Sequence, residues 1–458
     1  MKQYAITRLM MVVATSVAFA SAAHAFAPTI ANTRTSQDSK TGEVTVTYTL
    51  TGDASVITAD VQTNSAANAA WASIGAANYT GMTGDVWTVV EPDAAATRTI
   101  RWPKTAAGQA PLAFGRHVRV VLTAWSTNAP PDYLVVDLSD KTAKPQYYPE
   151  EILLPEGGSV TNAVYKDQYL VMKRIHAAGK TWMMSNDPVA KSQLRSEYRR
   201  ATECPHPVVL SRDYYIGVYE ITRAQYRRIT GNEPGGGGTE HLPVRWLSYA
   251  GLRGSKTGIL YPVFTDGKFD YEKSAQVDSG TPVAKLRTFP ALGRADLPTE
   301  AQWEFAARGG DRGLIPNGYT YAQTNLAKVA RCTANRNEVD CEGYTNTIAT
   351  VGSYEPNVFG LYDMLGNIAE HVLDRWIDLS TCNNGGPISS TEVVVDYIGG
   401  TSGLEIDKQG NVSTNTLTCG SMWDYGYGYM YIGYQGMSYA QNISSPGYLG
   451  WRAAMTLR

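Results

Sequence analysis

Hydrophobic and polar residues alternate along the first third of the chain. Val44, Val46, Tyr48 and Leu50 are separated by single threonines, and the alternation resumes at residues 57–61 after a Gly-Asp turn. Successive side chains of a strand point to opposite faces, so this period of two predicts antiparallel strands with one buried face. The pattern therefore predicts an all-β unit. Its further β-rich pieces are residues 86–90, 97–102, 117–125 and 133–138.

The number and spacing of these strands indicate their arrangement. Roughly seven short strands within about 100 residues are typical of an immunoglobulin- or fibronectin-like β-sandwich, which we expect over residues 26–140. No cluster of titratable residues lies in the predicted strands, so we expect a role in spacing or in adhesion, and a passive spacer is the simpler of the two. Pro145 and Pro149 then mark residues 141–152 as a linker.

Two short helices are indicated after the linker, where helical and extended patterns mix. Residues 222–231 and 299–309 each begin with threonine, carry glutamine three positions later and end with glycine. Threonine and glutamine satisfy the free amides of the first turn, and glycine adopts the left-handed conformation that ends a helix. Trp303, Ala306 and Ala307 fall on one side of the second helix, so we expect both helices to be amphipathic. The second part is thus predicted to be α+β.

Charge and composition narrow the possible partners. The 40 basic and 42 acidic residues nearly cancel among 458 residues, which argues against nucleic acid because its binding proteins carry a basic excess. Tyrosine is abundant, with 29 residues against 8 phenylalanines. Its apolar ring and hydroxyl suit half-exposed surfaces better than deep cores.

The first 25 residues have the features of a secretory signal peptide. Lys2 and Arg8 precede an apolar stretch over residues 9–20, and residues 23–25 read Ala-His-Ala, a small-x-small cleavage pattern. The stretch is shorter than the roughly 20 residues needed to span a bilayer, and no later segment is long and apolar enough. We therefore expect a secreted or periplasmic protein without a membrane span.

Export favours disulfides among the five cysteines. Cys332 and Cys341 are close enough to join in a short loop, whereas Cys382 and Cys419 flank a long glycine- and threonine-rich stretch. We expect these two pairs, with Cys204 left over, although other pairings are compatible with the sequence.

Four separated segments together resemble the sulfatase-modifying-factor family, whose founding activity is the formylglycine-generating enzyme. They are residues 215–226, residues 243–246, the run L-P-T-E-A-x-W-E within residues 297–310, and G-L-Y-D-M-x-G-N within residues 357–370, joined by Gly450-Trp451-Arg452. The resemblance covers residues 153–458. It implies a variant of the C-type lectin fold, with a small twisted sheet and little other regular structure.

The resemblance also implies one structural calcium site. Its ligands are the side chains of Asp363 and Glu370 and the backbone carbonyls of Gly366 and Ile368. Carboxylate and carbonyl oxygens in a tight loop suit this hard cation. The alternative is that the two carboxylates cap turns.

The family's copper chemistry is not expected here. The resemblance implies two copper-binding cysteines after a G-G-S motif, but this chain has Asp424 and Tyr429 at those positions and no cysteine after Cys419. Soft thiolates select copper(I), so oxygen groups do not replace them. We therefore expect no copper, no catalytic residue and no formylglycine-generating activity.

Aromatic residues stand where the family keeps its catalytic centre. Tyr425, Tyr427, Tyr429 and Tyr431 alternate with other residues, so an extended backbone places their rings on one face. Such rings give contact area at low entropic cost. We therefore expect a binding surface for a glycan or an extracytoplasmic protein. Its residues are Trp423, Asp424, Tyr425, Tyr427, Tyr429 and Tyr431.

Three hypotheses follow from these patterns. The first is an exported, non-catalytic protein that binds its ligand through this tyrosine-rich surface. The second is a metal-dependent oxidoreductase that uses a different site, for instance near Asp424 or His371. The third is a purely structural component, in which the tyrosines fill the face of a sheet.

Overall fold

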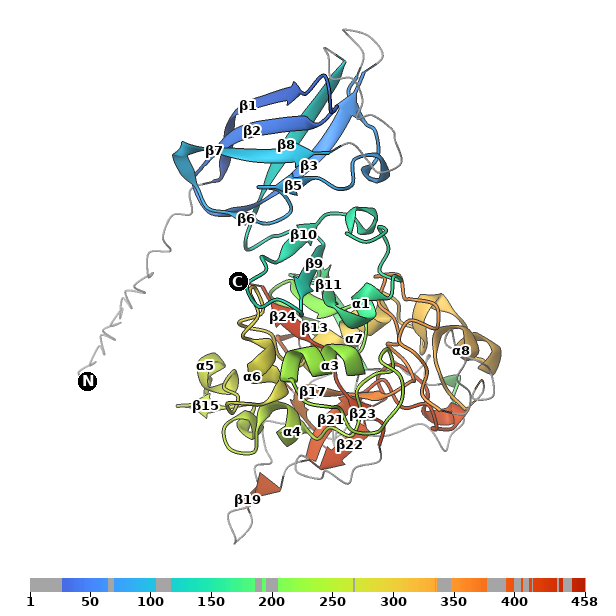
Figure 1. Ribbon diagram of the computed structural model, residues 1–458. Coiled ribbons are helices and arrows are strands. Elements are labelled where there is room, and N and C mark those ends of the chain that lie inside the picture. The colour runs from blue at the N-terminus through green and yellow to red at the C-terminus, as the bar shows by residue number, and fades with distance from the viewer. Residues whose placement is uncertain are drawn as a thin grey trace, which may run out of the picture.

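The computed structural model describes most of the chain outside its first 26 residues. The described residues are 27–64, 70–103, 117–185, 192–194, 205–266, 268–333, 335, 347–376, 393–398, 405–406, 412–413, 415–434, 436–439 and 447–457. The expected signal peptide, Cys204, Cys341 and Cys382 lie outside them. Figure 1 shows an N-terminal group of strands, coloured blue to cyan, next to a larger C-terminal part of mixed structure.

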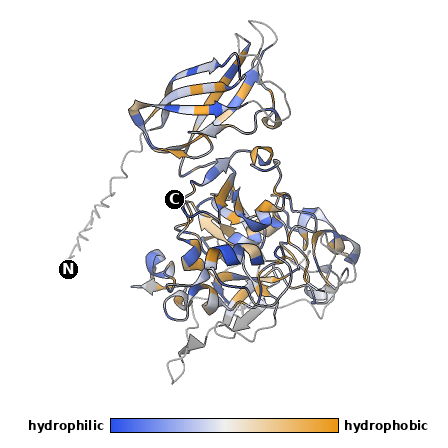
Figure 2. Cartoon of the chain, in the orientation of Figure 1, coloured by the Kyte–Doolittle hydropathy of each residue, from blue (hydrophilic) through white to orange (hydrophobic). Residues whose placement is uncertain are grey.

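The N-terminal strands form two antiparallel sheets that share one hydrophobic core, as expected for a β-sandwich. On the strand at residues 44–51, Val44, Val46, Tyr48 and Leu50 are buried and the threonines between them are half-buried, which confirms the predicted alternation. Figure 2 shows the same alternation of hydrophobic and hydrophilic residues along neighbouring strands. One sheet contains β1 (Thr29–Gln37), β2 (Val44–Thr51), β7 (Asp93–Trp102) and β5 (Thr83–Gly84), and the other contains β4 (Ala72–Ser73), β3 (Ser55–Thr63), β6 (Val89–Val90) and β8 (Val118–Ser126).

The last strand expected in the sandwich belongs instead to the second part. β9 (Tyr133–Asp137) pairs with β10 (Gln146–Tyr148) and with β11 (Tyr169–Ile175) in a five-stranded sheet. Our assignment of residues 133–138 to the sandwich, and of residues 146–148 to a linker, is therefore wrong. The physical reason is visible in β9, whose first four residues are all buried, because both of its faces are covered.

Trp87 joins the sandwich to the second part. Its carbonyl accepts a hydrogen bond from the Tyr147 amide at 2.6 Å, and its ring lies 5.5 Å from that of Tyr148. Thr88 donates to the carbonyl of Pro145 at 3.1 Å. Residues 146–148 of the segment expected to be a linker are thus a packed strand.

The second part is a mixed α/β structure with several small sheets and few helices. The five-stranded sheet is completed by β14 (Tyr214–Gly217) and β24 (Ala454–Thr456). The other strands are β12 (Thr181–Met184), β13 (His206–Val209), β18 (Val394–Val395), β15 (Phe264–Thr265), β16 (Lys268–Phe269), β17 (Ala369–Arg375), β21 (Asn415–Cys419), β22 (Gly436–Tyr439), β23 (Leu449–Gly450), β19 (Glu405–Ile406) and β20 (Val412–Ser413). The helices are α1 (Val164–Asp167), α3 (Arg223–Thr230), α4 (Tyr249–Arg253), α5 (Tyr271–Ser274), α6 (Pro282–Leu286), α7 (Glu300–Arg308) and α8 (Gln323–Val329), with 3₁₀ turns at Ala76–Asn78, Glu151–Leu153, Gly258–Leu260, Pro316–Gly318 and Tyr427–Tyr429.

Both predicted helices form with their predicted caps. α3 and α7 each have a complete capping box at the threonine and a left-handed glycine after the last residue. The expectation that α7 is amphipathic is wrong, because all nine of its residues are buried. Its polar positions are neutralised internally: Glu304 and Arg308 form an ion pair at 2.6 Å, and both bond to the backbone of Ser185.

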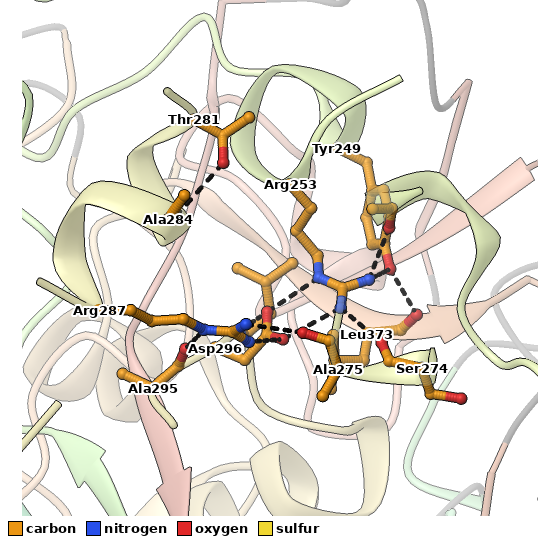
Figure 3. A network of polar contacts seen from close by, with 12 residues as sticks. Tyr249, Arg253, Ser274, Ala275, Thr281, Ala284, Arg287, Ala295, Asp296 and Leu373 are labelled. Atoms are coloured by element: carbon orange, nitrogen blue, oxygen red, sulfur yellow. Dashed lines mark hydrogen bonds and ion pairs between the residues drawn. The ribbon is translucent and has the colours of Figure 1, made fainter. Parts of the chain in front are cut away.

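A second buried ionic network connects the helices around α4 to the sheets (Figure 3). Arg253 is fully buried and donates to Asp296 at 2.9 Å, and Arg287 donates to the other oxygen of Asp296 at 2.7 Å. The Tyr249 hydroxyl accepts from Arg253 and donates to the carbonyl of Leu373 on β17. This network holds α4 and α6 against β17.

In the described residues no helix is long and apolar enough to cross a membrane.

Candidate functional site

The separated sequence motifs meet in one buried polar cluster. Glu220 follows β14, Trp303 lies on α7, Glu370 begins β17 together with Ala369, and Arg452 precedes β24. At most 1% of each of these four side chains is exposed. The motifs that resemble the family therefore build the interior beneath the C-terminal segment rather than an open pocket.

Glu370 is held by an ion pair and an indole. Its carboxylate accepts from Arg452 Nη2 at 2.8 Å and from Trp303 Nε1 at 2.8 Å. Arg452 also donates to the backbone carbonyls of Gly217, Val218 and Tyr362 at 2.8–3.0 Å. Breaking such a buried pair from one side leaves an uncompensated charge, which is strongly destabilising.

Glu220 and Asp363 complete the cluster next to the loop at residues 363–370. Glu220 accepts from the side chain of Asn367 at 2.7 Å and from the amide of Ile368 at 3.2 Å. One oxygen of Asp363 accepts from the amide of Gly352 at 2.6 Å. Its other oxygen, Oδ1, is buried without a hydrogen-bond partner in the described structure.

The cluster contains more negative than positive charge. Glu220, Asp363 and Glu370 face the guanidinium of Arg452, and the ammonium of Lys166 also acts on Asp363. Burial raises the pKa of Asp363 to about 6, although the Gly352 amide, Arg452 and Lys166 lower it. Burial, followed by the charges of Asp363 and Glu370, raises the pKa of Glu220 well above its usual value. Either protons or an additional cation would relieve this excess.

The four expected calcium ligands fit a cation unequally. Asp363 offers a buried, unbonded oxygen, which suits a hard cation. Glu370 is less suited, because both its oxygens are bonded to Arg452 and one also to Trp303. No group of three or more His, Cys, Asp or Glu side chains within the described residues is arranged to hold a metal ion. If calcium binds here, Asp363 and the carbonyls of Gly366 and Ile368 would have to supply its protein ligands.

His371 lies beside this loop but is a core residue. It is fully buried and makes a hydrogen bond of 2.9 Å to the carbonyl of Leu247. Burial lowers its pKa to about 4. The imidazole is therefore neutral at neutral pH.

Residues 420–423 directly precede the positions where the family has its copper-binding cysteines, and they contact the loop at residues 363–370. The amide of Gly366 donates to the carbonyl of Gly420 at 2.6 Å, and the amide of Trp423 donates to the carbonyl of Asn367 at 3.1 Å. Gly366 has φ +79°, and a Cβ there would lie 2.3 Å from the carbonyl oxygen of Arg331. Glycine is thus required for this close approach.

The tyrosines do not form the expected extended face. The chain turns after Trp423, and residues Tyr427–Tyr429 form a 3₁₀ turn. Glycines at positions 426, 428 and 433 interleave with the aromatic residues, and Gly433 has φ +85°. The single ring face predicted for residues 425–431 is therefore wrong, because a period of two places rings on one face only in an extended chain and this segment turns.

The rings instead pack against one another. Tyr425, Tyr429, Tyr431 and Tyr434, which we call the tyrosine cluster, form edge-to-face contacts with centroid distances of 5.6–6.0 Å. Tyr431 is 1% exposed, so the prediction that it contacts a ligand is wrong. Trp423, Tyr425 and Tyr429 are half-buried and Asp424 is exposed, while the side chain of Tyr427 lies outside the described residues.

The disulfide prediction depends on cysteines that lie partly outside the described residues. Cys419 on β21 is buried and forms no disulfide with another described residue, and its expected partner Cys382 lies outside them. Burial, together with the nearby carboxylates of Glu300 and Glu304, raises its pKa well above the usual value. Cys332 is buried, and its expected partner Cys341 lies outside the described residues.

Sequence reasoning missed an aromatic and basic surface beside Trp423. Tyr448 packs edge-to-face on Trp423 at 5.7 Å, and the guanidinium of Arg245 lies 6.0 Å from the Tyr448 ring centroid. Trp246 is 48% exposed, a high fraction for a tryptophan. The run Pro-Val-Arg-Trp at residues 243–246 was noticeable in the sequence, but no periodicity shows that Arg245 reaches the C-terminal segment.

Residues 141–452 match the family described as "Sulfatase-modifying factor enzyme 1-like domain". The chain belongs to this sulfatase-modifying factor family. It is 29% identical over 174 residues to the Chaperone protein LppX of Paenibacillus barcinonensis, covering 34% of this chain and 61% of that protein. It is 40% identical over 83 residues to the Formylglycine-generating enzyme of Thermomonospora curvata, covering 18% and 27%.

Among solved structures, Treponema denticola variable protein 1 aligns with a TM-score of 0.41 at 21% identity, covering 63% of this chain and 95% of that chain. The chain spans less than two thirds of the length of both sequence relatives. The family match thus confirms the resemblance that the four sequence motifs indicated.

Proposed function

We propose that this member of the family is an exported, non-catalytic protein that binds a glycan or protein ligand with Trp423, Asp424, Tyr425 and Tyr429. The observation that carries the proposal is the placement of this segment. The pairing of Gly366 with Gly420 and of Asn367 with Trp423 fixes it to the buried loop, while Asp424 stays exposed. A rigid base with partly exposed rings provides contact area without a large loss of conformational entropy on binding.

The state of the thiols supports the absence of copper oxidase activity. Asp424 and Tyr429 occupy the positions that the family resemblance assigns to the copper ligands. Cys419, which precedes both, is buried, and its raised pKa keeps it a thiol rather than the thiolate that copper(I) needs. The chaperone named among the relatives is consistent with a role other than this oxidation.

The same proposal includes the C-type-lectin variant of the fold and one structural calcium ion. The ion would be held by Asp363 and by the carbonyls of Gly366 and Ile368 and would offset the negative excess of the buried cluster. Its position beneath Trp423 gives it a structural role, which is to hold the loop that supports the binding segment.

The test is a glycan array and a set of purified extracytoplasmic proteins probed with the chain from residue 26 onward. We expect a ligand whose binding is lost in a Tyr425→Ala/Tyr429→Ala variant and retained in Tyr271→Ala, which alters an exposed tyrosine on α5. Unchanged binding of all ligands by the double variant would refute the proposed site. Metal analysis of the purified protein distinguishes the proposal from the oxidoreductase alternative. That alternative requires a redox metal in the purified protein, whereas the proposal expects calcium alone.

A further inference from the structure

Arg223 and Arg245, which lies beside Tyr448, form no ion pair with an acidic side chain among the described residues. Arg223 donates through Nη1 to the carbonyl of Gly235 at 2.6 Å, and Arg245 donates through Nη2 to the carbonyl of Gly236 at 2.7 Å. The Nε atoms of both are buried without a hydrogen bond in the described structure. Among the described residues, both guanidinium groups thus bond to backbone carbonyls of one glycine-rich loop.

The neighbouring arginines of the same helix are neutralised. Arg227 pairs with Glu233 and Glu240 at 2.6 Å, and Arg228 pairs with Asp167 at 2.7 Å. The hydrogen bond from Arg227 lowers the pKa of Glu233, and the charge of Arg223 lowers it further. The carboxylate of Glu233 accepts its hydrogen bond from Arg227. Arg223 also occupies the first position of α3, where the helix dipole disfavours a cation.

Arg245 likewise has no carboxylate acting on it among the described residues. Burial lowers the pKa of Arg245, the Tyr448 hydroxyl raises it, and the charge of Arg223 lowers it. Arginine stays protonated at any physiological pH, so the two like charges persist side by side. An anion that accepts from the guanidinium of Arg245 would offset the repulsion between the two arginines.

A fixed indole lies next to this charge. Trp246 has φ +64°, a conformation that costs free energy for a bulky residue. Its ring is packed so closely on Gly236 and Gly447 that a Cβ on either would lie 2.6 and 2.4 Å from ring atoms. Trp246 is nevertheless 48% exposed as a residue. Strain of this kind at an exposed aromatic residue indicates a functional position.

We propose that Arg245, Trp246, Tyr448 and Trp423, which we call the Arg–Trp face, bind an acidic sugar of an anionic glycan. The pyranose ring would stack on Trp246, and its carboxylate or sulfate would accept from Arg245, with Arg223 adding positive potential. This inference rests on the proposed ligand-binding function and names the class of ligand. A pyranose fits because one side of its ring presents C–H groups that can stack on an indole, and its acidic group is held close to that ring. On this face the guanidinium of Arg245 likewise lies next to the indole of Trp246 in sequence.

An acidic peptide fits the face less well. It carries each carboxylate on a flexible side chain, so the entropy lost on binding is larger. It also gains little from a single fixed indole. The experiment therefore treats peptide binding as an outcome against the proposal.

The probes are oligogalacturonic acid, its methyl ester with the same rings but no charge, a heparin-derived sulfated oligosaccharide and poly-glutamate. Isothermal titration calorimetry is performed on the chain from residue 26 onward at two salt concentrations. We expect binding of the carboxylated or the sulfated oligosaccharide, weakening with salt, and none of the methyl ester. The preferred acid distinguishes uronic from sulfated sugars.

Variants assign the binding to the face. Arg245→Gln and Trp246→Ala should each weaken binding by about tenfold or more, since a charge-assisted hydrogen bond contributes on this scale. Arg245→Lys should bind with intermediate affinity, and Arg228→Gln should bind as the wild type. Melting temperatures verify that each variant is folded.

Three results would overturn the inference: no binding of either acidic glycan, equal binding of the methyl ester, or wild-type affinity of Arg245→Gln. Binding of poly-glutamate more tightly than of both acidic glycans would also overturn it in favour of an acidic peptide. The failure of the inference is separable from that of the proposed function. A neutral or protein ligand lost in Tyr425→Ala/Tyr429→Ala but unaffected by Arg245→Gln leaves the proposed function intact.

Discussion

Arg452 and Glu370 form a fully buried ion pair, with Nη2 and Oε1 2.8 Å apart and neither side chain exposed to solvent. The pair joins the segment before β24 to the start of β17, which are 82 residues apart in the chain. Glu370 was expected to bind calcium. Its actual contacts make it the counter-ion of an arginine that also holds three backbone carbonyls.

Removing one partner of this pair should strongly destabilise the protein. Arg452→Met leaves Glu370 buried without its counter-ion, so we expect the free energy of unfolding to fall by about 3–5 kcal/mol. Urea unfolding measures the change. Arg228→Gln is the control, because its pair with Asp167 is partly exposed, and such pairs contribute at most about 1 kcal/mol. Equal effects of the two substitutions would contradict the importance of the buried pair.

Calcium should stabilise the protein through Asp363. With calcium at about 100 times its dissociation constant, we expect the free energy of unfolding to rise by about 2.7 kcal/mol, and EGTA should remove the gain. Differential scanning calorimetry with and without EGTA provides the measurement. Asp363→Ala should abolish the response, whereas Asp270→Asn should retain it because that carboxylate caps α5. A melting temperature that does not depend on calcium in the wild type would exclude the site.

Local signals in the sequence were sufficient for some elements and not for others. The caps at Thr222 and Thr299 depend on residues three positions away, so the starts of α3 and α7 were predictable. The strand at residues 133–137 was recognised as a strand, but its partners are decided by β11. Alternation reports which faces are buried and carries no information on which sheet the strand joins.

The motifs marked the residues of the candidate site but not how they are arranged. The bond between Gly366 and Gly420 brings residues 363–370 and 419–424 together, and the sequence motifs gave no indication of this contact. The burial of Tyr431 was not predictable, because a period of two assumes an extended chain, whereas residues 427–429 form a 3₁₀ turn. The pairing of Arg245 with Tyr448 joins residues 203 positions apart, a contact that no local pattern encodes.

Cys419 should be unreactive in the native protein. Its thiol is buried and its pKa is raised, so the thiolate that attacks alkylating reagents is scarce. We expect iodoacetamide to label Cys419 only after unfolding in urea, as measured by peptide mass mapping. The urea-treated sample is the control for reagent activity. Recovery of a disulfide-linked peptide containing Cys382 and Cys419 would contradict the free thiol.

The carboxylate of Asp278 should contribute to acid sensitivity. Partial burial raises its pKa, but hydrogen bonds from the Thr257 hydroxyl and from three backbone amides outweigh burial and bring the pKa to about 2. An unfolded aspartate titrates near a pKa of about 3.9. The folded state therefore holds the proton more weakly, so its stabilisation is complete above about pH 4 and is lost as the pH falls towards 2.

Asp278→Asn should accordingly lower the free energy of unfolding at neutral pH and reduce its further loss between about pH 4 and 3. Urea unfolding at neutral pH, at about pH 4 and at about pH 3 measures both effects. Thr257→Val is the matched variant: it keeps the carboxylate but removes the strongest donor, so the acid-dependent loss should shrink less than in Asp278→Asn. If Asp278→Asn loses as much stability on acidification as the wild type, the charge of Asp278 does not stabilise the turn at residues 256–258. The three hydrogen bonds to Oδ1 would then act in the same way on the oxygen of a neutral amide, while the Lys256 amide, which donates to Oδ2, would lose its acceptor.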